Sequence, residues 1–579
     1  MLKNFIKTAL RNLVRNKTFS IINIAGLAIG MSCAALIFMW VNDELSFDNF
    51  HQNKDQIYRI WVQRNDTNDI WTTTPGLLAA AVKSKIPEIK YAARLMQNHR
   101  NPYKYQDKAF YEEHTYCADP DFFKMFDFPI VQGNVASPLE HPNNIVITEK
   151  VAWKYFGDEN PVGKTLNWNN WADYQVSAVL KDIPANSHLQ TQLVESHGLS
   201  ERFWRGGYNW TNFVHTTYIQ VEENSHIKEI EKKIENILNE NYTTSDRYYE
   251  VRLQPLADIH LNASIPSSFA VTGDRTYVTI FSIIAIGILL IACVNFINIS
   301  TATSMTRAKE VAIRKVVGIH QKRLVFQFMG ESAILTFIAS LLAAIVIDLA
   351  LPYFNQFTGK ELSLDSRFYL FFFIIFLFTA LFAGSYPALH LSAFSPLVLL
   401  KTISGSSKQR ISLRSALVIF QFLISILLIS CTLFINHQMN YIQNKKMGFD
   451  RRLSRLFTWF SFLAIFISCL GLYGLATFVA SKRTKEIGIR KVMGSTVANI
   501  VLLLSKSFLR WVLFANLLAW PIAWYAMNKW LQDFAYRINI TIWPFIWAGL
   551  AALLIALATL SCQAIRAGKT NPVKALRYE

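Results

Sequence analysis

The sequence predicts an α-helical multi-pass membrane protein, with eight spans in two four-helix units and one inserted α+β domain outside the membrane. Three observations predict this class. Hydrophobic residues make up 52% of the 579-residue chain, and the mean hydropathy of +0.22 is high for a soluble protein of this length. Eight apolar runs are each long enough to cross a bilayer, which takes about 20 residues. A basic twelve-residue motif occurs twice, each time between two such runs.

The eight apolar runs are separated by loops of alternating charge. The runs cover residues 19–41, 277–300, 325–351, 368–390, 415–436, 457–480, 502–530 and 541–564. Segments after the second, fourth, sixth and eighth runs are rich in Lys and Arg, whereas those after the third and seventh are short and nearly balanced. Because basic loops stay in the cytoplasm, this alternation predicts two cytoplasmic termini. The segment 437–456 disagrees, since it should lie outside yet carries five Lys and Arg against one Asp.

The N-terminal stretch favours a retained first span. Residues 1–17 carry five basic residues and no acidic one, and the first apolar run follows directly. A cleaved signal peptide is the alternative interpretation. The run closes at Asn42 without an Ala-x-Ala-like cleavage site, so we expect the span to stay, with the N-terminus in the cytoplasm.

Residues 42–275 are polar and contain no spanning run. Residues 144–148 and 174–179 read as strands, and residues 226–239 carry isoleucines at helical spacing. We therefore expect one α+β domain of one or two lobes, placed across the membrane from the N-terminus.

The basic motif runs from Arg307 to Gly318 and is repeated from Arg483 to Gly494. A second pair of matching segments, around Pro396 and around Pro572, is separated by the same offset in residue number. A constant offset between two landmarks indicates two copies of one membrane unit.

Each copy of the motif reads as a short helix that a glycine ends. Glu310 lies four residues before Arg314, and Glu486 four before Arg490, which is the stabilising order for a helical ion pair. We expect the helices to cover about residues 306–322 and 482–498. The alternative is a basic loop that only fixes membrane orientation. The repetition of acidic and basic residues at fixed positions favours a docking surface.

Residues 157–165 resemble a phosphate-binding loop but lack its geometry. Five residues separate Gly157 from Gly163, where the phosphate loop has four, and a strand-like segment follows instead of a helix. We interpret the stretch as a turn. The sequence contains no other Walker-like stretch, so we do not expect the chain to hydrolyse ATP by itself.

Other kinds of chemistry lack a sequence signal. No Cys or His spacing suggests zinc, no catalytic triad has its signature, and Cys117 has no partner cysteine within its domain. We therefore expect no metal, cofactor or catalytic residues. The net charge is +18, and many of the Lys and Arg residues lie at the ends of apolar runs. This placement is typical of membrane orientation and argues against nucleic acid as a binding partner. Ionisable residues are missing from the middle of the spans, which disfavours a secondary transporter.

In these residues and motifs, the chain resembles the bacterial ABC transporter permeases of the MacB/FtsX type. The two Arg-x-Lys-Glu-[Val/Ile]-x-Ile-Arg-Lys-Val segments are the most specific elements. Further matches resemble the family's periplasmic core domain, and they lie at residues 44–51, 57–59, 152–165, 182–188 and 255–261.

The resemblance implies a mechanism and a set of docking residues. A separate ATPase subunit, in two copies, would dock on the two motif helices, and its movement would reach the periplasmic domain through long helices. Substrate would be exported or extracted outside the membrane. The docking residues implied are Arg307, Lys309, Glu310, Arg314, Lys315, Arg483, Lys485, Glu486, Arg490 and Lys491.

The resemblance also implies a domain organisation in the bacterial inner membrane. The segments are 1–41, the N-terminus and first span; 42–275, the MacB-like periplasmic core domain; 276–401, the first FtsX-like unit; 402–456, the fifth span and a shortened outer loop; and 457–579, the second unit. Fused family members usually carry a second periplasmic domain where this chain has the short outer loop. We therefore keep open a second hypothesis, a membrane scaffold that uses the same ATPase to regulate a periplasmic enzyme, and we expect lipid and a possible periplasmic protein as further partners.

Overall fold

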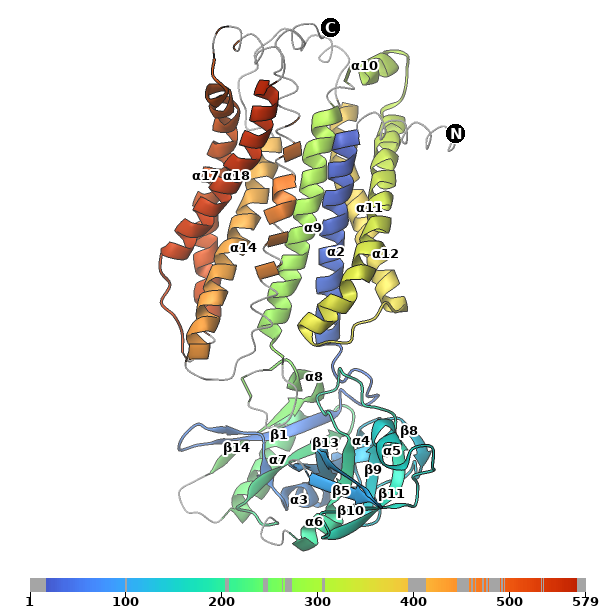
Figure 1. Ribbon diagram of the computed structural model, residues 1–579. Helices are drawn as coiled ribbons and strands as arrows, with labels where there is room; N and C mark the ends of the chain where they lie inside the picture. The colour runs from blue at the N-terminus through green and yellow to red at the C-terminus, as the bar shows by residue number, and fades with distance from the viewer. Residues whose placement is uncertain are drawn as a thin grey trace. The chain divides into compact units, whose positions relative to one another are not determined.

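A computed structural model of the chain forms two compact units (Figure 1). A helical unit comprises Met1–Trp40 and Ile280–Glu579, and a mixed α/β unit comprises Val41–Thr279. The structure describes residues 17–98, 101–203, 208–242, 248–262, 264–265, 273–304, 308–393, 413–444, 458–459, 462–463, 465–470, 473–474, 477, 490, 493, 495–532, 534 and 536–569.

Long apolar helices make up the helical unit. They are α2 (Lys17–Leu45), α9 (Arg275–Ser304), α11 (Gln321–Thr358), α12 (Ser366–Ala393), α14 (Leu413–Asn444), α17 (Val497–Leu531) and α18 (Trp543–Lys569), with the short α10 (Ala308–Val316) between α9 and α11. Among the described residues, six of these helices are long and apolar enough to cross a membrane, namely α2, α9, α11, α12, α14 and α18. The seventh predicted run lies within α17, and the sixth is only partly covered by the described residues. The total of eight spans therefore stays a prediction.

Small residues allow these helices to pack closely. Two alanine rows with a spacing of four residues are buried, and the rows are Ala515, Ala519 and Ala523 on α17 and Ala548, Ala552 and Ala556 on α18. Five of these alanines belong to one core with α14. Between α2 and α9, a Cβ added at Gly30 would collide with the Cβ of Ala292. Membrane helices commonly associate through such contacts, because small side chains bring the backbones together.

The internal repeat predicted from the sequence is visible in the helix boundaries. Helix α11 begins at Gln321 and α17 begins at Val497, the position that the offset between the two motif copies assigns to it. Each helix follows an extended N-cap residue, His320 or Thr496. The two halves therefore share the same turn from the motif segment into the next long helix.

One 14-stranded sheet organises the α/β unit. Its strands are β1 (Ile57–Arg64), β2 (Ile70–Trp71), β3 (Thr74–Pro75), β4 (Ile89–Asn98), β5 (Asn101–Tyr105), β6 (Lys108–Glu112), β7 (Thr115–Ala118), β8 (Ile130–Gly133), β9 (Asn144–Thr148), β10 (Thr165–Trp168), β11 (Ala172–Leu180), β12 (Leu193–Ser196), β13 (Phe213–Val221) and β14 (Tyr249–Pro255). The main path through the sheet is β14-β1-β13-β4-β7-β12-β9-β11-β10-β5-β6. Its helices are α3 (Leu78–Lys85), α4 (Phe122–Met125), α5 (Glu149–Phe156), α6 (His197–Phe203), α7 (Ile227–Asn241) and α8 (Leu256–Ile259).

Among its described residues, three hydrophobic cores hold this unit together. One core packs α3 and α7 on the β14 end of the sheet, a second packs α5 on β9–β11, and a central core lies between them. The isoleucines that predicted the helix at 226–239 face the first core, where Ile230, Ile234 and Ile237 are buried. The strands expected at 144–148 and 174–179 are confirmed as β9 and part of β11.

The loop that resembles a phosphate-binding loop is a turn, as expected. Gly157 and Gly163 have φ values of 61° and 83°, a region that glycine adopts readily. Lys164 pairs with Glu159, and β10 begins at Thr165 where a phosphate loop would have a helix.

Candidate functional site

The first repeated motif forms α10, and a glycine closes it. The N–H of Ile319 donates to the carbonyl of Arg314 at 3.1 Å, and the N–H of Gly318 donates to that of Lys315 at 3.0 Å. Gly318 has a φ of 94°. These bonds define a Schellman C-cap. The expected glycine stop is therefore confirmed, and because the helix ends at Val316 it is shorter than the predicted range 306–322.

The second motif is followed by the same type of backbone hydrogen bond as the first. The N–H of Ser495 donates to the carbonyl of Arg490 at 2.9 Å, and these two residues are the counterparts of Ile319 and Arg314 in the repeat. A hydrogen bond across five residues fixes the chain direction at the end of a helix. The two copies therefore turn in the same way into α11 and α17.

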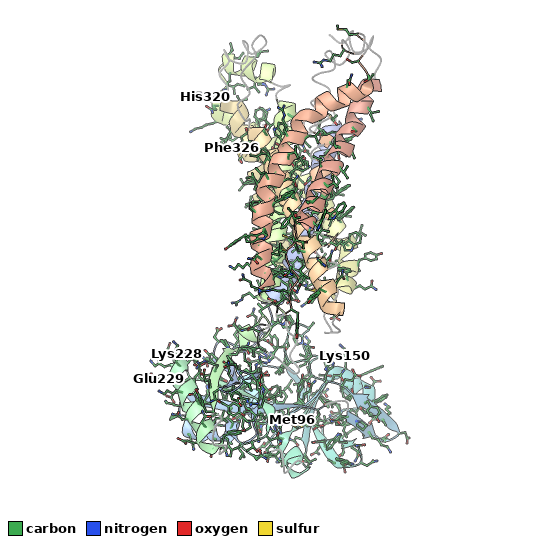
Figure 2. The ribbon with its side chains drawn as sticks, turned by 90° about the vertical axis from the view of Figure 1, so that its left-hand side faces the viewer. Met96, Lys150, Lys228, Glu229, His320 and Phe326 are labelled. Carbon is green, nitrogen blue, oxygen red and sulfur yellow. The ribbon has the colours of Figure 1, made fainter. Side chains whose placement is uncertain are left out.

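One side of α10 and the residue that follows the helix form an exposed apolar surface. Val311 is buried against Leu324, Phe328 and Ala388, which fixes the helix to α11 and α12. The opposite surface is formed by Ile313, Val316 and Val317, with exposed fractions of 63%, 69% and 78%. Figure 2 labels His320 and Phe326 at this end of the helical unit. In the second copy, Met493 occupies the position of Val317 and is 81% exposed.

Basic side chains flank this apolar surface. Arg314 donates from Nη1 to Oε1 of Gln327 at 3.2 Å, and Gln327 donates to Oε1 of Glu331 at 3.3 Å. These bonds connect α10 to the first turns of α11. Arg314 and Lys315 are half-buried, whereas Arg490 is exposed.

Several of the predicted docking residues lie outside this description. The backbones of Lys309 and Glu310 are in α10, but their side chains are outside the described residues. Also outside are Arg307, Arg483, Lys485, Glu486 and Lys491. The ion pairs expected from Glu310 and Glu486 therefore stay predictions.

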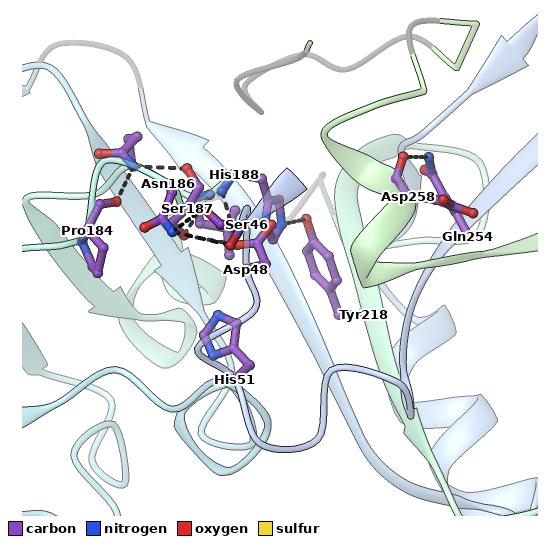
Figure 3. Close-up of polar contacts among 12 residues, drawn as sticks. Ser46, Asp48, His51, Pro184, Asn186, Ser187, His188, Tyr218, Gln254 and Asp258 are labelled. Carbon is purple, nitrogen blue, oxygen red and sulfur yellow. Dashed lines mark hydrogen bonds and ion pairs between the residues drawn. The ribbon is translucent and has the colours of Figure 1, made fainter. Parts of the chain in front are cut away.

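In the α/β unit, the segment after α2 is anchored by Asp48 (Figure 3). Its Oδ2 lies 2.8 Å from Nδ1 of His188, and its Oδ1 accepts from the backbone N–H of His188 at 3.1 Å and from Ser187 at 3.2 Å. Asn186 donates to the carbonyl and the hydroxyl of Ser46 at 3.2 and 3.0 Å. Two motifs that lie about 140 residues apart in the sequence thus meet in one cluster.

The Asp48 cluster is buried and structural. Asp48 is 1% exposed and has a φ of 57°, in the left-handed region. Burial alone would raise the pKa of Asp48, but the charge and hydrogen bonds of His188 outweigh it, so the pKa is lowered. Nε2 of His188 lies 2.9 Å from the hydroxyl of Tyr218 on β13. Because all three side chains are sealed from solvent, the cluster holds the chain in place.

Two further polar clusters are buried in the same unit. Glu195 accepts hydrogen bonds from Tyr103, Tyr174, Cys117 and Asn98, although burial still raises its pKa. His197 and His215 have ring centroids 5.3 Å apart, and burial lowers their pKa values to about 3 and about 4. No group of three or more His, Cys, Asp and Glu residues in the described part of the chain is placed to hold a metal ion.

Sequence reasoning did not find two of these features. The exposed apolar surface of α10 could not be predicted from the sequence, because its valines and isoleucine would fit a buried helix face equally well. The Asp48 cluster needed the folded chain to bring distant motifs together. Its only sequence signal was the presence of Ser46, Asp48 and His188 within segments that resemble the family.

Two family models match most of the chain. Residues 20–237 match the model of the MacB-like periplasmic core domain. Residues 282–396 and 458–572 each match the FtsX-like permease C-terminal model, and the two matches are related by the same offset as the two motif copies.

Individual relatives cover part of the chain. An uncharacterised ABC transporter permease, YknZ of Bacillus subtilis, is 28% identical over 196 residues, which is 34% of this chain and 46% of the relative. The pyoverdine export ATP-binding/permease protein PvdT of Pseudomonas syringae is 26% identical over 239 residues, which is 40% of this chain and 34% of the relative. The alignments thus span less than half the length of these relatives.

The periplasmic region of MacB from Actinobacillus actinomycetemcomitans is similar at 16% identity and a TM-score of 0.27, covering 34% of this chain and 87% of that one. The matched models together extend from the first span to the last, with a periplasmic core domain between the first span and two copies of the permease domain. The chain therefore belongs to the MacB/FtsX family of ABC transporter permeases, membrane proteins of the bacterial inner membrane.

Proposed function

We propose that the chain is the permease subunit of an ATP-binding-cassette system, which couples a separate ATPase to the export or extraction of substrate in the periplasm by mechanotransmission. The observation that carries the proposal is the repeated motif, whose two copies are followed by the same backbone bond, from Ile319 to Arg314 and from Ser495 to Arg490. An exposed apolar side chain at the same position of each motif copy, Val317 in the first and Met493 in the second, suits two copies of the same ATPase. The names of relatives such as PvdT join an ATP-binding part to a permease part, which supports this pairing.

Docking would combine an apolar centre with a basic border. Val316, Val317 and Met493 are exposed apolar side chains at the ends of the two motif segments. Burying such side chains against a partner gives about 25 cal/mol per Å² of apolar area. The basic border comprises Arg307, Lys309, Arg314, Lys315, Arg483, Lys485, Arg490 and Lys491, with Glu310 and Glu486 as acidic partners. In this proposal both termini and both docking segments lie in the cytoplasm, and the chain has eight spans in total.

A second candidate function is supported by the short segment 437–456. It occupies the place where the repeat predicts a second outer domain, and substrate export between two opposed lobes would lack one of them. In this alternative, the chain is a scaffold whose single periplasmic domain regulates a periplasmic enzyme when the ATPase acts.

The docking surface is tested by co-purification from native membranes in mild detergent, followed by an ATP hydrolysis assay. We expect Val317→Asp combined with Met493→Asp to remove the ATPase, because a charge at each site opposes burial of the apolar surface. Val135→Asp is the matched control, since Val135 is 70% exposed in the α/β unit.

A second double variant tests the motif itself. Glu310→Lys with Glu486→Lys reverses a charge in each motif helix, and we expect it to abolish ATPase binding while membrane insertion stays normal. Normal co-purification of both double variants would refute the docking assignment. A bound ATPase that moves no substrate but retains a periplasmic enzyme would favour the scaffold.

A further inference from the structure

His260 lies at the end of α8, where three segments of the chain meet. Its Nε2 is 2.8 Å from Oε2 of Glu44, in the last turn of α2. The side chains of both residues are almost completely buried, with exposed fractions of 3% and 7%. A buried pair of this kind holds firmly, because separating it would leave a polar group inside the protein without its partner.

Phe47 makes a second contact from the same segment. Its ring stacks on the His260 ring, with centroids 3.3 Å apart and planes 3° from parallel. Glu44 and Phe47 thus hold the imidazole at its edge and on its face. The end of the first span therefore cannot move relative to α8 without breaking both contacts.

The segment that leads into α9 passes directly over this pair. The N–H of Gly273 donates to the carbonyl of His260 at 2.6 Å, and the N–H of Arg275 donates to that of Leu261 at 3.1 Å. A Cβ added at Gly273 would lie 2.6 Å from Oε2 of Glu44 and 2.8 Å from Nε2 of His260. Only glycine allows so close an approach.

A chain of polar contacts leads from α8 into the sheet. Gln254 on β14 donates to the carbonyl of Asp258 at 3.2 Å. Arg59 on β1, only 1% exposed, donates from Nε to Oε1 of Gln254 at 3.1 Å. Strands β1 and β14 pair over seven residues, from Tyr58 with Pro255 to Arg64 with Tyr249. A displacement of His260 would therefore be passed to the β14 end of the sheet.

We propose that the pair of Glu44 and His260, covered by Gly273, is the coupling point at which movements of the first and second spans enter the periplasmic domain. His260 is in this view a positioning residue, because it acts through the segments that it joins. The inference rests on the proposed function, since it assigns the residue through which ATPase-driven movement is transmitted. The Asp48 cluster attaches only the segment after α2, whereas His260 contacts the segments of both spans.

The test uses the full-length chain with its co-purified ATPase in lipid nanodiscs. Hydrogen exchange of peptides covering β14 and α8 is compared with and without a non-hydrolysable ATP analogue. We expect a nucleotide-dependent difference in the wild type. Gly273→Ala and His260→Phe should lose this difference while ATP hydrolysis and co-purification continue. Glu88→Gln, which breaks an exposed ion pair with Lys233, is the control and should keep it.

Each result has a distinct meaning. A nucleotide-dependent difference in exchange that is retained in both variants would overturn the coupling role. A wild type that binds the ATPase but shows no such difference would overturn it as well. If the variants do not fold, as judged by exchange of β4 and β13 without nucleotide, Glu44→Gln decides, since it keeps the side-chain shape but removes the charge. Loss of the response in Glu44→Gln supports the proposal and a full response refutes it. A wild type that binds no ATPase is a separate result, which refutes the proposed function itself.

Discussion

The carboxylate of Glu235 on α7 accepts a hydrogen bond from the backbone N–H of Val251 on β14 at 3.1 Å. Glu231 accepts from the N–H of Leu253 at 2.8 Å, and Asn239 accepts from that of Tyr249 at 2.9 Å. Acceptors four residues apart on the helix thus serve donors two residues apart on the strand. Strand β14 ends the main path of the sheet, and unpaired strand edges invite association with other chains. Helix α7 covers this edge.

Glu235→Leu should expose this edge. The N–H of Val251 would lose its acceptor, which costs about 1–3 kcal/mol for a buried donor. We expect faster hydrogen exchange at Val251 and a greater tendency of the purified chain to aggregate. Glu235→Gln is the control, because its amide oxygen can still accept the bond. Equal exchange at Val251 in the two variants would show that the edge is protected by something other than the acceptor.

Asp48→Ala should destabilise the α/β unit strongly. The change leaves His188 without its charged partner and removes a residue type that tolerates the left-handed backbone, so a loss of about 3–5 kcal/mol is expected. Thermal unfolding of the purified full-length chain measures it. Asp48→Asn keeps an acceptor for the His188 N–H and tolerates the same φ, so its loss should be smaller. Identical unfolding of the two variants would contradict the role given to Asp48.

Acidification should loosen β13 and its neighbours through His197 and His215. Their pKa values of about 3 and about 4 lie below the value of about 6.5 of an exposed histidine. The unfolded chain therefore binds protons at higher pH than the folded one. Stability is fully present above pH 6.5 and falls as the pH drops towards 4, by about 1.4 kcal/mol per pH unit for each group.

Hydrogen exchange of β13 peptides in the full-length chain, corrected for the intrinsic rate, compares pH 7 with pH 5. We expect His215→Leu to reduce the loss of protection at pH 5, because it removes one group that must be charged on unfolding. His141→Leu is the control, since His141 is exposed. The same acid sensitivity in His215→Leu and wild type would exclude this histidine as the cause.

Ala519→Leu should disrupt the contact between α17 and α18. Ala519 is completely buried in the core of the second half, and additional methylenes in a packed core cost about 1–3 kcal/mol. Thermal unfolding in detergent and cross-linking between the two helices measure the effect. Leu517→Phe, at a position that is 69% exposed, also enlarges a side chain and should be tolerated. Equal stability of the two variants would show that α17 and α18 do not pack through the alanine rows.

Much of the architecture could be predicted because it follows periodic or repeated signals. Long apolar runs determine where helices form, since a backbone inside a membrane must satisfy its hydrogen bonds within the helix. The constant offset between the two motif copies predicted two equivalent units, and the helix starts at Gln321 and Val497 reproduce it. The glycine stop of α10 could be predicted for a related reason, because Gly318 adopts a backbone conformation that other residues rarely adopt.

The sequence by itself determined the apolar runs, the repeat, the basic motif and the strand and helix types of the inserted domain. Tertiary structure alone decided which polar residues meet, because contacts such as Glu44 with His260 join positions 216 residues apart and leave no local pattern. It also decided which side of α10 is exposed, since Val311 and Val317 are chemically alike and differ only in whether a neighbouring helix covers them. Local periodicity reports backbone hydrogen bonding and average burial, whereas a site is made by the packing of distant segments.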